Sequence, residues 1–344
     1  MARLFFLLSG EHPDLPMAEL RAILEAEACR HRVAVLLPQV VLLEADESCI
    51  KCVAGRASMM RSCGLTLFDC TAKADSIYRE ARALKADDFL GPDQSFVVRI
   101  KRVQASSPDL NIDGLEREIG AAILEGAPRL RVNLKRPDRV LLGILSGERF
   151  VFGVKRVDLP TKPFIDRSPS RRPYFHPSTM MPKMARCMVN LARARAGQTL
   201  LDPFCGVGGI LLEAGLLGCE VIGVDVKYYM AGRTLRNLRY YGVDPSGVVA
   251  GDARKLPLRT VDVIATDPPY GRSSTTMKSS TGIIVRAFLE HAMSLLPRRG
   301  YLSTASPKGV KISEIGESLG FEVVEKYYLQ VHRSLTREIV AFRR

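Results

Sequence analysis

The sequence predicts an α/β protein of several modules, with a Rossmann-like parallel sheet in its C-terminal half. Three observations support this fold class. The first 70 residues alternate strand and helix patterns in the order βαββαβ. From residue 199 onward, uninterrupted apolar strands alternate with helices, which is typical of a parallel sheet covered on both faces. The chain then ends with two strands joined by a short loop, which predicts a reversed last strand. A length of 344 residues allows two or three domains.

Residues 1–70 are expected to form a ferredoxin-like module. The apolar run at residues 4–8 is too short for a signal peptide and no small-residue cleavage site follows it, so we interpret it as part of the first strand. No apolar stretch is long enough to span a bilayer, and we expect a cytosolic protein. The predicted strands cover residues 3–8, 32–37, 40–44 and 62–68, and the predicted helices cover residues 15–26 and 48–57.

Residues 71–157 are expected to form a second α/β module, and residues 158–182 a basic linker. The linker contains six prolines, which remove backbone donors and disfavour helix. The second module has predicted helices at residues 75–84 and 112–124 and predicted strands at residues 95–102, 131–133, 139–145 and 149–157. The C-terminal domain, residues 183–344, has predicted strands at residues 199–201, 220–224, 247–250, 261–266, 300–304, 321–329 and 337–342.

The excess positive charge lies in one central stretch. The net charge is +13, yet residues 1–70 carry seven Lys and Arg against nine Asp and Glu. Residues 129–195 carry sixteen against four. A solvated surface is the usual explanation of a charge run, but this concentration favours a phosphate-binding face. The expected phosphate contacts are Arg131, Lys135, Arg136, Arg171 and Arg172; alternatively, Arg171 and Arg172 only brace the linker.

The eight cysteines do not predict a metal site. Cys49 and Cys52 form one CxxC pair, but a second pair at metal-ligand spacing is missing. Both fall in a predicted helix with an apolar face. Buried thiols are therefore favoured over zinc ligands.

A glycine-rich turn is predicted after the first strand of the C-terminal domain, in LLDPFCGVGGILLEAG (residues 200–215). Glycines allow the backbone to approach a ligand closely, and the carboxyl end of a strand is where an open α/β sheet binds ligands. Taken alone, a tight turn is as good an explanation. The candidate cofactor-binding residues in this segment are Asp202, Pro203, Phe204, Cys205, Gly206 and Gly208.

Acidic residues at the ends of the next strands strengthen the cofactor interpretation. Asp225 can accept both hydroxyls of a ribose. Asp252, followed by Ala253, can meet an adenine edge. Each acid taken singly could be a helix cap or a loop residue. Three successive strands that all end in an aspartate are hard to explain by caps and loops alone. Because no GxxxxGK[ST] loop is present, a cofactor with adenosine and no pyrophosphate fits, and S-adenosylmethionine is such a cofactor.

The segment DPPY, Asp267 to Tyr270, follows the fourth strand and resembles the signature of methyltransferases that act on amino groups. A rigid turn is the alternative. Asp267 and the carbonyl of Pro268 can accept the two N–H groups of an exocyclic amine and align its lone pair. Pro268 and Pro269 fix the loop. Tyr270 can stack on a base taken out of its helix.

The whole chain resembles the archaeal tRNA (guanine-10-N2)-methyltransferases, which are THUMP-domain RNA methyltransferases. The resemblance is strongest in RRPYFHPSTMMPKMARCMVNLA, LLDPFCGVGG, GDARKLP, DPPYGRSS and VHRSLTREI. Val207 replaces the threonine of the family pattern DPFCGTGG, which puts a hydroxyl contact there in doubt. The resemblance implies a ferredoxin-like module, a THUMP tRNA-binding module and a class I methyltransferase domain. It also implies transfer of one or two methyl groups to guanine N2 of tRNA.

Several alternatives stay open. The substrate could be another RNA site, ribosomal RNA or DNA, or the chain could be a tRNA-binding protein with a decayed catalytic domain. Some relatives are similar to proteins that work with a small zinc-containing activator subunit. His176 is expected to pack or to cover the cofactor rather than act as a general base. His332 and Arg333 could contact RNA or lie in a solvated loop.

Overall fold

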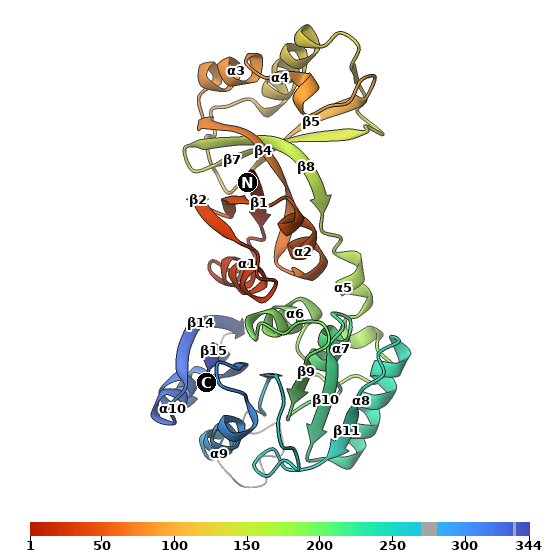
Figure 1. Ribbon diagram of the computed structural model, residues 1–344, viewed down its shortest axis with the longest axis vertical. Coiled ribbons are helices and arrows are strands. Elements are labelled where there is room, and N and C mark those ends of the chain that lie inside the picture. The colour runs from red at the N-terminus through yellow and green to blue at the C-terminus, as the bar shows by residue number, and fades with distance from the viewer. Residues whose placement is uncertain (270–280, 333–334) are drawn as a thin grey trace. The chain divides into compact units, whose positions relative to one another are not determined.

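The computed structural model describes residues 1–269, 281–332 and 335–344 (Figure 1). The chain divides into two compact units that are described separately. The first unit contains residues 1–16, 29–55 and 60–159, and the second contains residues 17–28, 56–59 and 160–344. No helix within the described ranges has the length and apolar character needed to cross a membrane.

The first unit is built mainly from strands, with helices between them. Its strands are β1 (Ala2–Leu8), β2 (His31–Leu37), β3 (Val40–Ala45), β4 (Met60–Thr71), β5 (Ser95–Arg102), β6 (Arg131–Val132), β7 (Arg139–Ser146) and β8 (Arg149–Asp158). Its helices are α2 (Ser48–Arg56), α3 (Ala74–Arg82), a short 3-10 turn (Ala86–Asp88) and α4 (Ile112–Gly126).

One eight-stranded sheet runs through this unit in the order β2-β3-β1-β4-β8-β7-β5-β6. The strands of the two expected N-terminal modules are joined because β4 pairs antiparallel with β8. Gly64 on β4 and Gly153 on β8 lie at this junction. A Cβ atom at Gly64 would lie 2.0 Å from the carbonyl oxygen of Val154, and one at Gly153 would lie 2.0 Å from that of Leu65. Only glycine permits so close a backbone approach.

Two helices cover one face of the part of the sheet formed by β5, β7 and β8. Ile77 of α3 and Ile119 of α4 are fully buried, and they belong to one core with Phe96 and Phe150. The apolar positions Leu115, Ile119 and Ile123 recur every four residues, so α4 buries one stripe. This packing fixes β5 and β7, which pair in parallel.

The second unit consists of a sheet with helices on both faces, together with the segments 17–28 and 56–59 from the N-terminal part of the chain. Most of α1 (Leu15–Ala26) belongs to it. Its other helices are α5 (Lys162–Asp166), a 3-10 turn (Pro169–Arg171), α6 (Pro182–Leu191), α7 (Gly209–Gly215), α8 (Tyr228–Tyr240), α9 (Thr281–Leu295), a 3-10 turn (Lys308–Val310) and α10 (Ile312–Ser318). Its strands are β9 (Thr199–Asp202), β10 (Glu220–Asp225), β11 (Gly247–Ala250), β12 (Val263–Thr266), β13 (Tyr301–Pro307), β14 (Glu322–His332) and β15 (Leu335–Arg343).

The sheet of the second unit has the order β11-β10-β9-β12-β13-β15-β14. The first five strands in this order are parallel, and β15 runs antiparallel to both β13 and β14. The expected reversal of the last strand is confirmed. The structure adds that β15 inserts between β13 and β14. The chain therefore forms the edge strand β14 first, and the reversed strand β15 then fills the gap between β14 and β13.

Helices α7 and α8 pack beside β9, β10 and β11, while α9 and α10 lie over the core formed with β12 and β13 (Figure 1).

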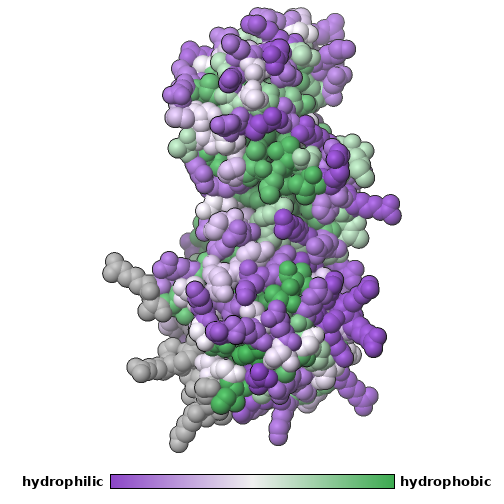
Figure 2. Space-filling view, turned by 90° about the vertical axis from the view of Figure 1, so that its left-hand side faces the viewer, coloured by the Kyte–Doolittle hydropathy of each residue, from purple (hydrophilic) through white to green (hydrophobic). Residues whose placement is uncertain are grey.

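The expected linker contains α5 and a 3-10 turn. In each of these the proline stands in the first turn, where its missing N–H costs no hydrogen bond. The prediction that prolines exclude helix here was therefore wrong. Hydrophilic residues cover most of the face drawn in Figure 2, with smaller hydrophobic patches between them.

Candidate active site

Three acidic side chains meet at the edge of the second unit's sheet where neighbouring parallel strands end. Asp202 ends β9, Asp225 ends β10, and Asp267 directly follows β12. Because β9 lies between β10 and β12, Asp202 has both other carboxylates within electrostatic range. The structure thus brings Asp267 of the DPPY segment together with Asp202 and Asp225, two of the acids expected to bind the cofactor.

The glycine-rich turn after β9 adopts a backbone conformation that other residues rarely take. Gly206 has φ +55° and Gly208 has φ +82°. A Cβ atom at Gly208 would lie 2.9 Å from Cγ2 of Thr234 on α8. The Thr234 hydroxyl also donates a 2.7 Å hydrogen bond to the Gly206 carbonyl oxygen. The turn is therefore held against α8, with no room for a side chain at Gly208 and a left-handed backbone at both glycines.

The three residues before Gly206 turn their side chains into the protein. Pro203 is buried, and Cys205 is 5% exposed. The ring of Phe204 packs edge-on against that of Phe288, with 5.4 Å between centroids. Burial raises the pKa of the Cys205 thiol well above its usual value, so the thiol stays neutral. These residues would therefore meet a cofactor through backbone atoms.

Asp202 is a buried carboxyl group with two local donors. One of its oxygens, Oδ1, accepts a 2.6 Å hydrogen bond from the Thr266 hydroxyl and a 3.1 Å bond from the Phe204 amide. Burial raises its pKa to about 7, and nearby Asp267 and Asp225 contribute to the rise. A neutral or cationic hydrogen-bond donor would find a strong acceptor here.

Asp225 holds the glycine turn in place while remaining half-buried. Its Oδ2 atom accepts a 3.1 Å hydrogen bond from the Gly206 amide, and its Oδ1 atom accepts a 2.9 Å bond from the Lys227 amide. Burial raises the pKa of this carboxyl group. His176 lies within electrostatic range of it, and its Nδ1 atom is 2.7 Å from the Ser178 hydroxyl. His176 thus lies near Asp225, on the side of the crevice assigned to the cofactor.

Asp252, beyond the end of β11, is occupied by its own neighbour. Arg254 lies 2.6 Å from Oδ2 of Asp252, and the Arg254 amide donates to Oδ1 at 2.9 Å. These hydrogen bonds lower the pKa of Asp252. Ala253 is 4% exposed. An adenine edge at this position would therefore meet an Asp–Arg pair, and Arg254 was not among the expected site residues.

Asp267 is the acid best placed for chemistry on a substrate. Burial raises the pKa of Asp267, the nearby Arg337 guanidinium partly opposes this rise, and the resulting pKa is about 7. Arg337 Nη2 lies 3.4 Å from Oδ2 of Asp267, while Oδ1 has no hydrogen-bond partner within the described part of the chain. Pro268 is buried and Pro269 half-buried. Tyr270, the fourth expected catalytic residue, lies outside the described residues.

Arg337 is a site residue that sequence reasoning missed. It stands on β15, in the segment VHRSLTREI that the family resemblance had marked without assigning a role. Its residue surface is 9% exposed. The register pairs Pro307 of β13 with Arg337, so the insertion of β15 beside β13 carries this cation toward the edge where β12 ends.

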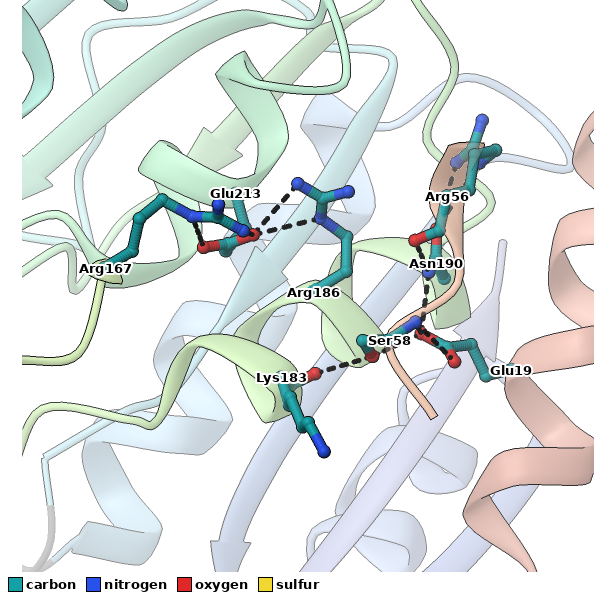
Figure 3. Close-up of polar contacts among 8 residues, drawn as sticks. All are labelled: Glu19, Arg56, Ser58, Arg167, Lys183, Arg186, Asn190 and Glu213. Atoms are coloured by element: carbon teal, nitrogen blue, oxygen red, sulfur yellow. Dashed lines mark hydrogen bonds and ion pairs between the residues drawn. The ribbon is translucent and has the colours of Figure 1, made fainter. Parts of the chain in front are cut away.

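The basic run at residues 129–195 is not one continuous exposed surface. Glu213 of α7 is fully buried and binds both Arg167, at 2.8 Å, and Arg186, at 2.9 Å (Figure 3). Arg172 is 5% exposed and donates from Nε to the Arg167 carbonyl oxygen at 2.9 Å. This burial argues against the expected contact between Arg172 and phosphate, because a buried guanidinium has little access to RNA. Arg171 is exposed and pairs with Asp166 at 2.8 Å.

A second buried network ties the N-terminal segments to this unit. Glu19 accepts hydrogen bonds from the Ser58 hydroxyl at 2.6 Å and from the Asn190 side-chain amide at 2.8 Å (Figure 3). Arg56 donates to the Asn190 side-chain oxygen at 3.2 Å. The Ser58 hydroxyl oxygen also lies 2.8 Å from the carbonyl oxygen of Lys183. Residues 17–28 and 56–59 are thus built into the unit that carries the crevice.

The other expected phosphate contacts lie in the first unit and are exposed. Asn133 Oδ1 accepts 3.1 Å hydrogen bonds from the amides of Lys135 and Arg136, which fixes the turn after β6. Arg131, Lys135 and Arg136 are exposed, and none forms an ion pair within the ranges that the structure covers. They present positive charge at the surface, although Asp138 lies within electrostatic range of Arg131.

Comparisons with known proteins agree with this architecture. Residues 169–339 match the protein-family model of the RMKL-like methyltransferase domain, and residues 71–154 match that of the THUMP domain. A tRNA (guanine(10)-N2)-dimethyltransferase from Methanothermobacter thermautotrophicus is 36% identical, over 97% of each chain. One from Methanocaldococcus jannaschii is 31% identical, over 98% of this chain and 99% of its own.

A solved structure shares the fold of the whole chain. TrmN from Thermus thermophilus superposes with a TM-score of 0.57 at 21% identity, over 99% of both chains. Together with the glycine turn, the acids of the crevice and Asp267 beside Pro268, the full-length identity confirms the resemblance seen in the sequence. The chain therefore belongs to the tRNA (guanine(10)-N2)-dimethyltransferase family of THUMP-containing methyltransferases.

Proposed function

We propose that this enzyme methylates the exocyclic N2 amine of a guanine in tRNA, at position 10, with S-adenosylmethionine as methyl donor. The observation that carries the proposal is the pair Asp267–Pro268 at the end of β12, next to the crevice formed by Asp202, Asp225 and the glycine turn. The names of the full-length relatives support tRNA as the substrate class and position 10 as the target.

The residues of the crevice fit S-adenosylmethionine. The turn at Gly206 and Gly208 provides backbone with no side chain in the way. Asp225 can accept ribose hydroxyls, because each of its oxygens accepts one backbone hydrogen bond and has a lone pair for a second. Asp202 provides a buried acceptor for the methionine ammonium. When bound, this cofactor supplies a methyl group made electrophilic by its sulfonium.

Asp267 would orient the guanine amine. An exocyclic amine is a poor nucleophile because its lone pair is delocalised into the ring. The unpartnered Oδ1 of Asp267 and the carbonyl oxygen of Pro268 would accept its two N–H groups. Two fixed acceptors favour a pyramidal nitrogen and aim the lone pair at the electrophile. Asp267 accepts best when ionised, so we expect turnover to rise with pH through about 7.

The exposed residues of the first unit would hold the tRNA. Arg131, Lys135 and Arg136 form no ion pair among the described residues, and Asn133 fixes the backbone at Lys135 and Arg136. Contacts to phosphates position a nucleic acid without reading its sequence. Arg171 could join them only by releasing Asp166. A small zinc-containing activator subunit remains a prediction from the family resemblance, and comparing the activity of the chain alone and with such a subunit tests it.

The test is methylation of an unmodified tRNA transcript, followed by nucleoside analysis. We expect N2-methylguanosine, N2,N2-dimethylguanosine or both, and loss of product when guanine 10 of the transcript is replaced by adenine. The Asp267→Ala variant should bind the cofactor normally in a calorimetric titration and lose turnover about 100- to 1,000-fold, as for removal of one preorganised polar group. Methylation at another RNA site, or no cofactor binding by the wild type, would refute the proposal.

A further inference from the structure

Large aromatic side chains are exposed at the start of α8, close to the cofactor crevice. Tyr228 is 84% exposed and Tyr229 is 50% exposed. They follow Asp225 by three and four residues in the chain. Single exposed apolar residues need no explanation, but two adjacent tyrosines beside a binding crevice suggest a contact surface.

Cations lie over the rings of Tyr229 and of Tyr174, a half-buried tyrosine that precedes α6. The Arg233 guanidinium is 5.1 Å from the ring centroid of Tyr229 and 5.8 Å from that of Tyr174. Arg236 lies 5.6 Å from the Tyr174 ring and donates a 2.5 Å hydrogen bond to its hydroxyl oxygen. Lys227 Nζ is 5.8 Å from the Tyr229 ring. We call these five residues and Tyr228 the α8 stacking face.

The positive charge of the α8 stacking face is not neutralised by salt bridges. Lys227, Arg233 and Arg236 form no ion pair within the residues that the structure describes, whereas Arg239, near the other end of α8, pairs with Asp244 at 3.8 Å. Cations stacked on aromatic rings keep their charge and most of their hydrogen-bond donors available. The face therefore offers π surfaces and phosphate-binding groups together.

The α8 stacking face is fixed to the cofactor turn by a buried residue. Asn237 is 1% exposed, and its side-chain oxygen accepts a 2.9 Å hydrogen bond from the Tyr174 amide. Its side-chain nitrogen donates 2.9 Å bonds to the carbonyl oxygens of Tyr174 and Val207. Val207 lies between the two glycines of the turn. Whatever binds on this face is thus held in a fixed position relative to the crevice.

We propose that the α8 stacking face binds unpaired nucleotides of the RNA substrate next to the target guanine. A base would stack on the exposed tyrosine rings, and Arg233 and Arg236 would contact adjacent phosphates. This inference rests on the proposed function, since it takes RNA as the substrate. Aromatic rings and arginine planes recognise unstacked RNA bases, and such stacking tolerates any base sequence. Charge complementarity favours a polyanion over a protein partner.

The experiment compares three double variants in the full-length protein. Tyr228→Ala/Tyr229→Ala removes the rings, and Arg233→Met/Arg236→Met removes the charges. The matched control is Tyr328→Ala/Lys308→Met, which removes a tyrosine with a lysine 5.1 Å from its ring at the opposite edge of the same sheet. We measure the dissociation constant for a tRNA transcript at several salt concentrations, the dissociation constant for S-adenosylmethionine and the melting temperature.

We expect the tyrosine variant to bind tRNA roughly 5- to 150-fold more weakly, with an unchanged salt slope, as for the loss of one stacked base. The arginine variant should lower the slope of log affinity against log salt by about 1.5, because two phosphate contacts are lost. Replacing Tyr228 and Tyr229 with Phe should restore affinity. All variants should bind S-adenosylmethionine as tightly as the wild type does. The control variant should also bind tRNA as tightly as the wild type does.

Two results would overturn the inference. If both test variants bound tRNA within twofold of the wild type, the face would not contact RNA. If the tyrosine variant lost cofactor affinity as much as tRNA affinity, the rings would belong to the cofactor site. Neither result would contradict the proposed function, because the wild type would still methylate tRNA. A wild type that neither bound nor methylated tRNA would instead refute the proposed function and remove the basis for the inference.

Discussion

Removing Arg337 tests whether its charge keeps Asp267 ionised. Arg337 Nη2 lies 3.4 Å from Oδ2 of Asp267, and the two side chains are 11% and 14% exposed. An opposite charge at this distance lowers a carboxyl pKa by about one to three units. Burial has already raised the pKa of Asp267 to about 7 in the presence of this cation. In Arg337→Met the acidic limb of the turnover profile should therefore move up by about one to three pH units.

The sign and size of the effect follow from the ionised fraction. At pH 7.5 most Asp267 is ionised in the wild type, so the shift should reduce turnover roughly 3- to 200-fold. At pH 9.5 the variant should regain between about a quarter and nearly all of the wild-type rate, because that fraction of Asp267 is ionised for shifts of three to one units. Arg337→Lys retains a charge and should shift the limb less. Affinity for S-adenosylmethionine should change little, because Arg337 pairs with Asp267, the acid assigned to the substrate amine.

The assay is turnover of saturating tRNA and cofactor between pH 6 and 9.5. Arg343→Met is the matched control, since Arg343 lies on the same strand and pairs with Glu322 at 2.5 Å on the exposed surface. Melting temperatures measured alongside separate a folding defect from a chemical one. If Arg337→Met lost activity by the same factor at every pH, the charge argument would be refuted and Arg337 would serve only to shape the site.

Three further outcomes are expected. Asp225→Ala should weaken S-adenosylmethionine binding roughly 10- to 150-fold, as for losing a hydrogen bond to a charged group, and an unchanged calorimetric dissociation constant would remove Asp225 from the site. The folded pKa of Asp202, about 7, exceeds its unfolded value, so its contribution to the free energy of unfolding is present below about pH 4 and lost as pH rises toward 7. Asp202→Asn should reduce the decline between pH 5 and pH 8, measured by urea titration, by up to about 2.7 kcal/mol; identical pH dependence in the two proteins would contradict it. Arg172→Met should leave the salt slope of tRNA binding unchanged, whereas Arg171→Ala should lower it by at most about 0.9; a lower slope for Arg172→Met would show that its buried guanidinium reaches RNA.

Much of the fold could be predicted from periodicity alone. The expected helix at residues 15–26 and strand at residues 95–102 coincide with α1 (Leu15–Ala26) and β5 (Ser95–Arg102). Uninterrupted apolar strands between helices predicted the parallel sheet, and the final hairpin predicted the reversed strand. Apolar patterns report which residues are buried, and burial on two faces leaves few sheet architectures open.

Local sequence also located the crevice, because the carboxyl ends of parallel strands lie on one edge of a sheet. Asp202, Asp225 and Asp267 each end or follow such a strand, so their convergence needed no coordinates. The glycines were informative for the same reason, since a turn with φ +82° at Gly208 excludes other residues. These features depend on neighbours within a few positions.

Only the tertiary structure decided which charged side chains pair with one another. Asp267 pairs with Arg337, 70 positions later, and Glu213 binds Arg167 and Arg186 inside what looked like an exposed basic run. The segment around Glu19 lies in the unit that carries the crevice. A run of basic residues has the same sequence pattern whether its side chains are exposed to solvent or paired with a buried carboxylate. Only the path of the chain decides which, because Coulombic and hydrogen-bonding contacts depend on distance in space and leave no periodic trace along the sequence.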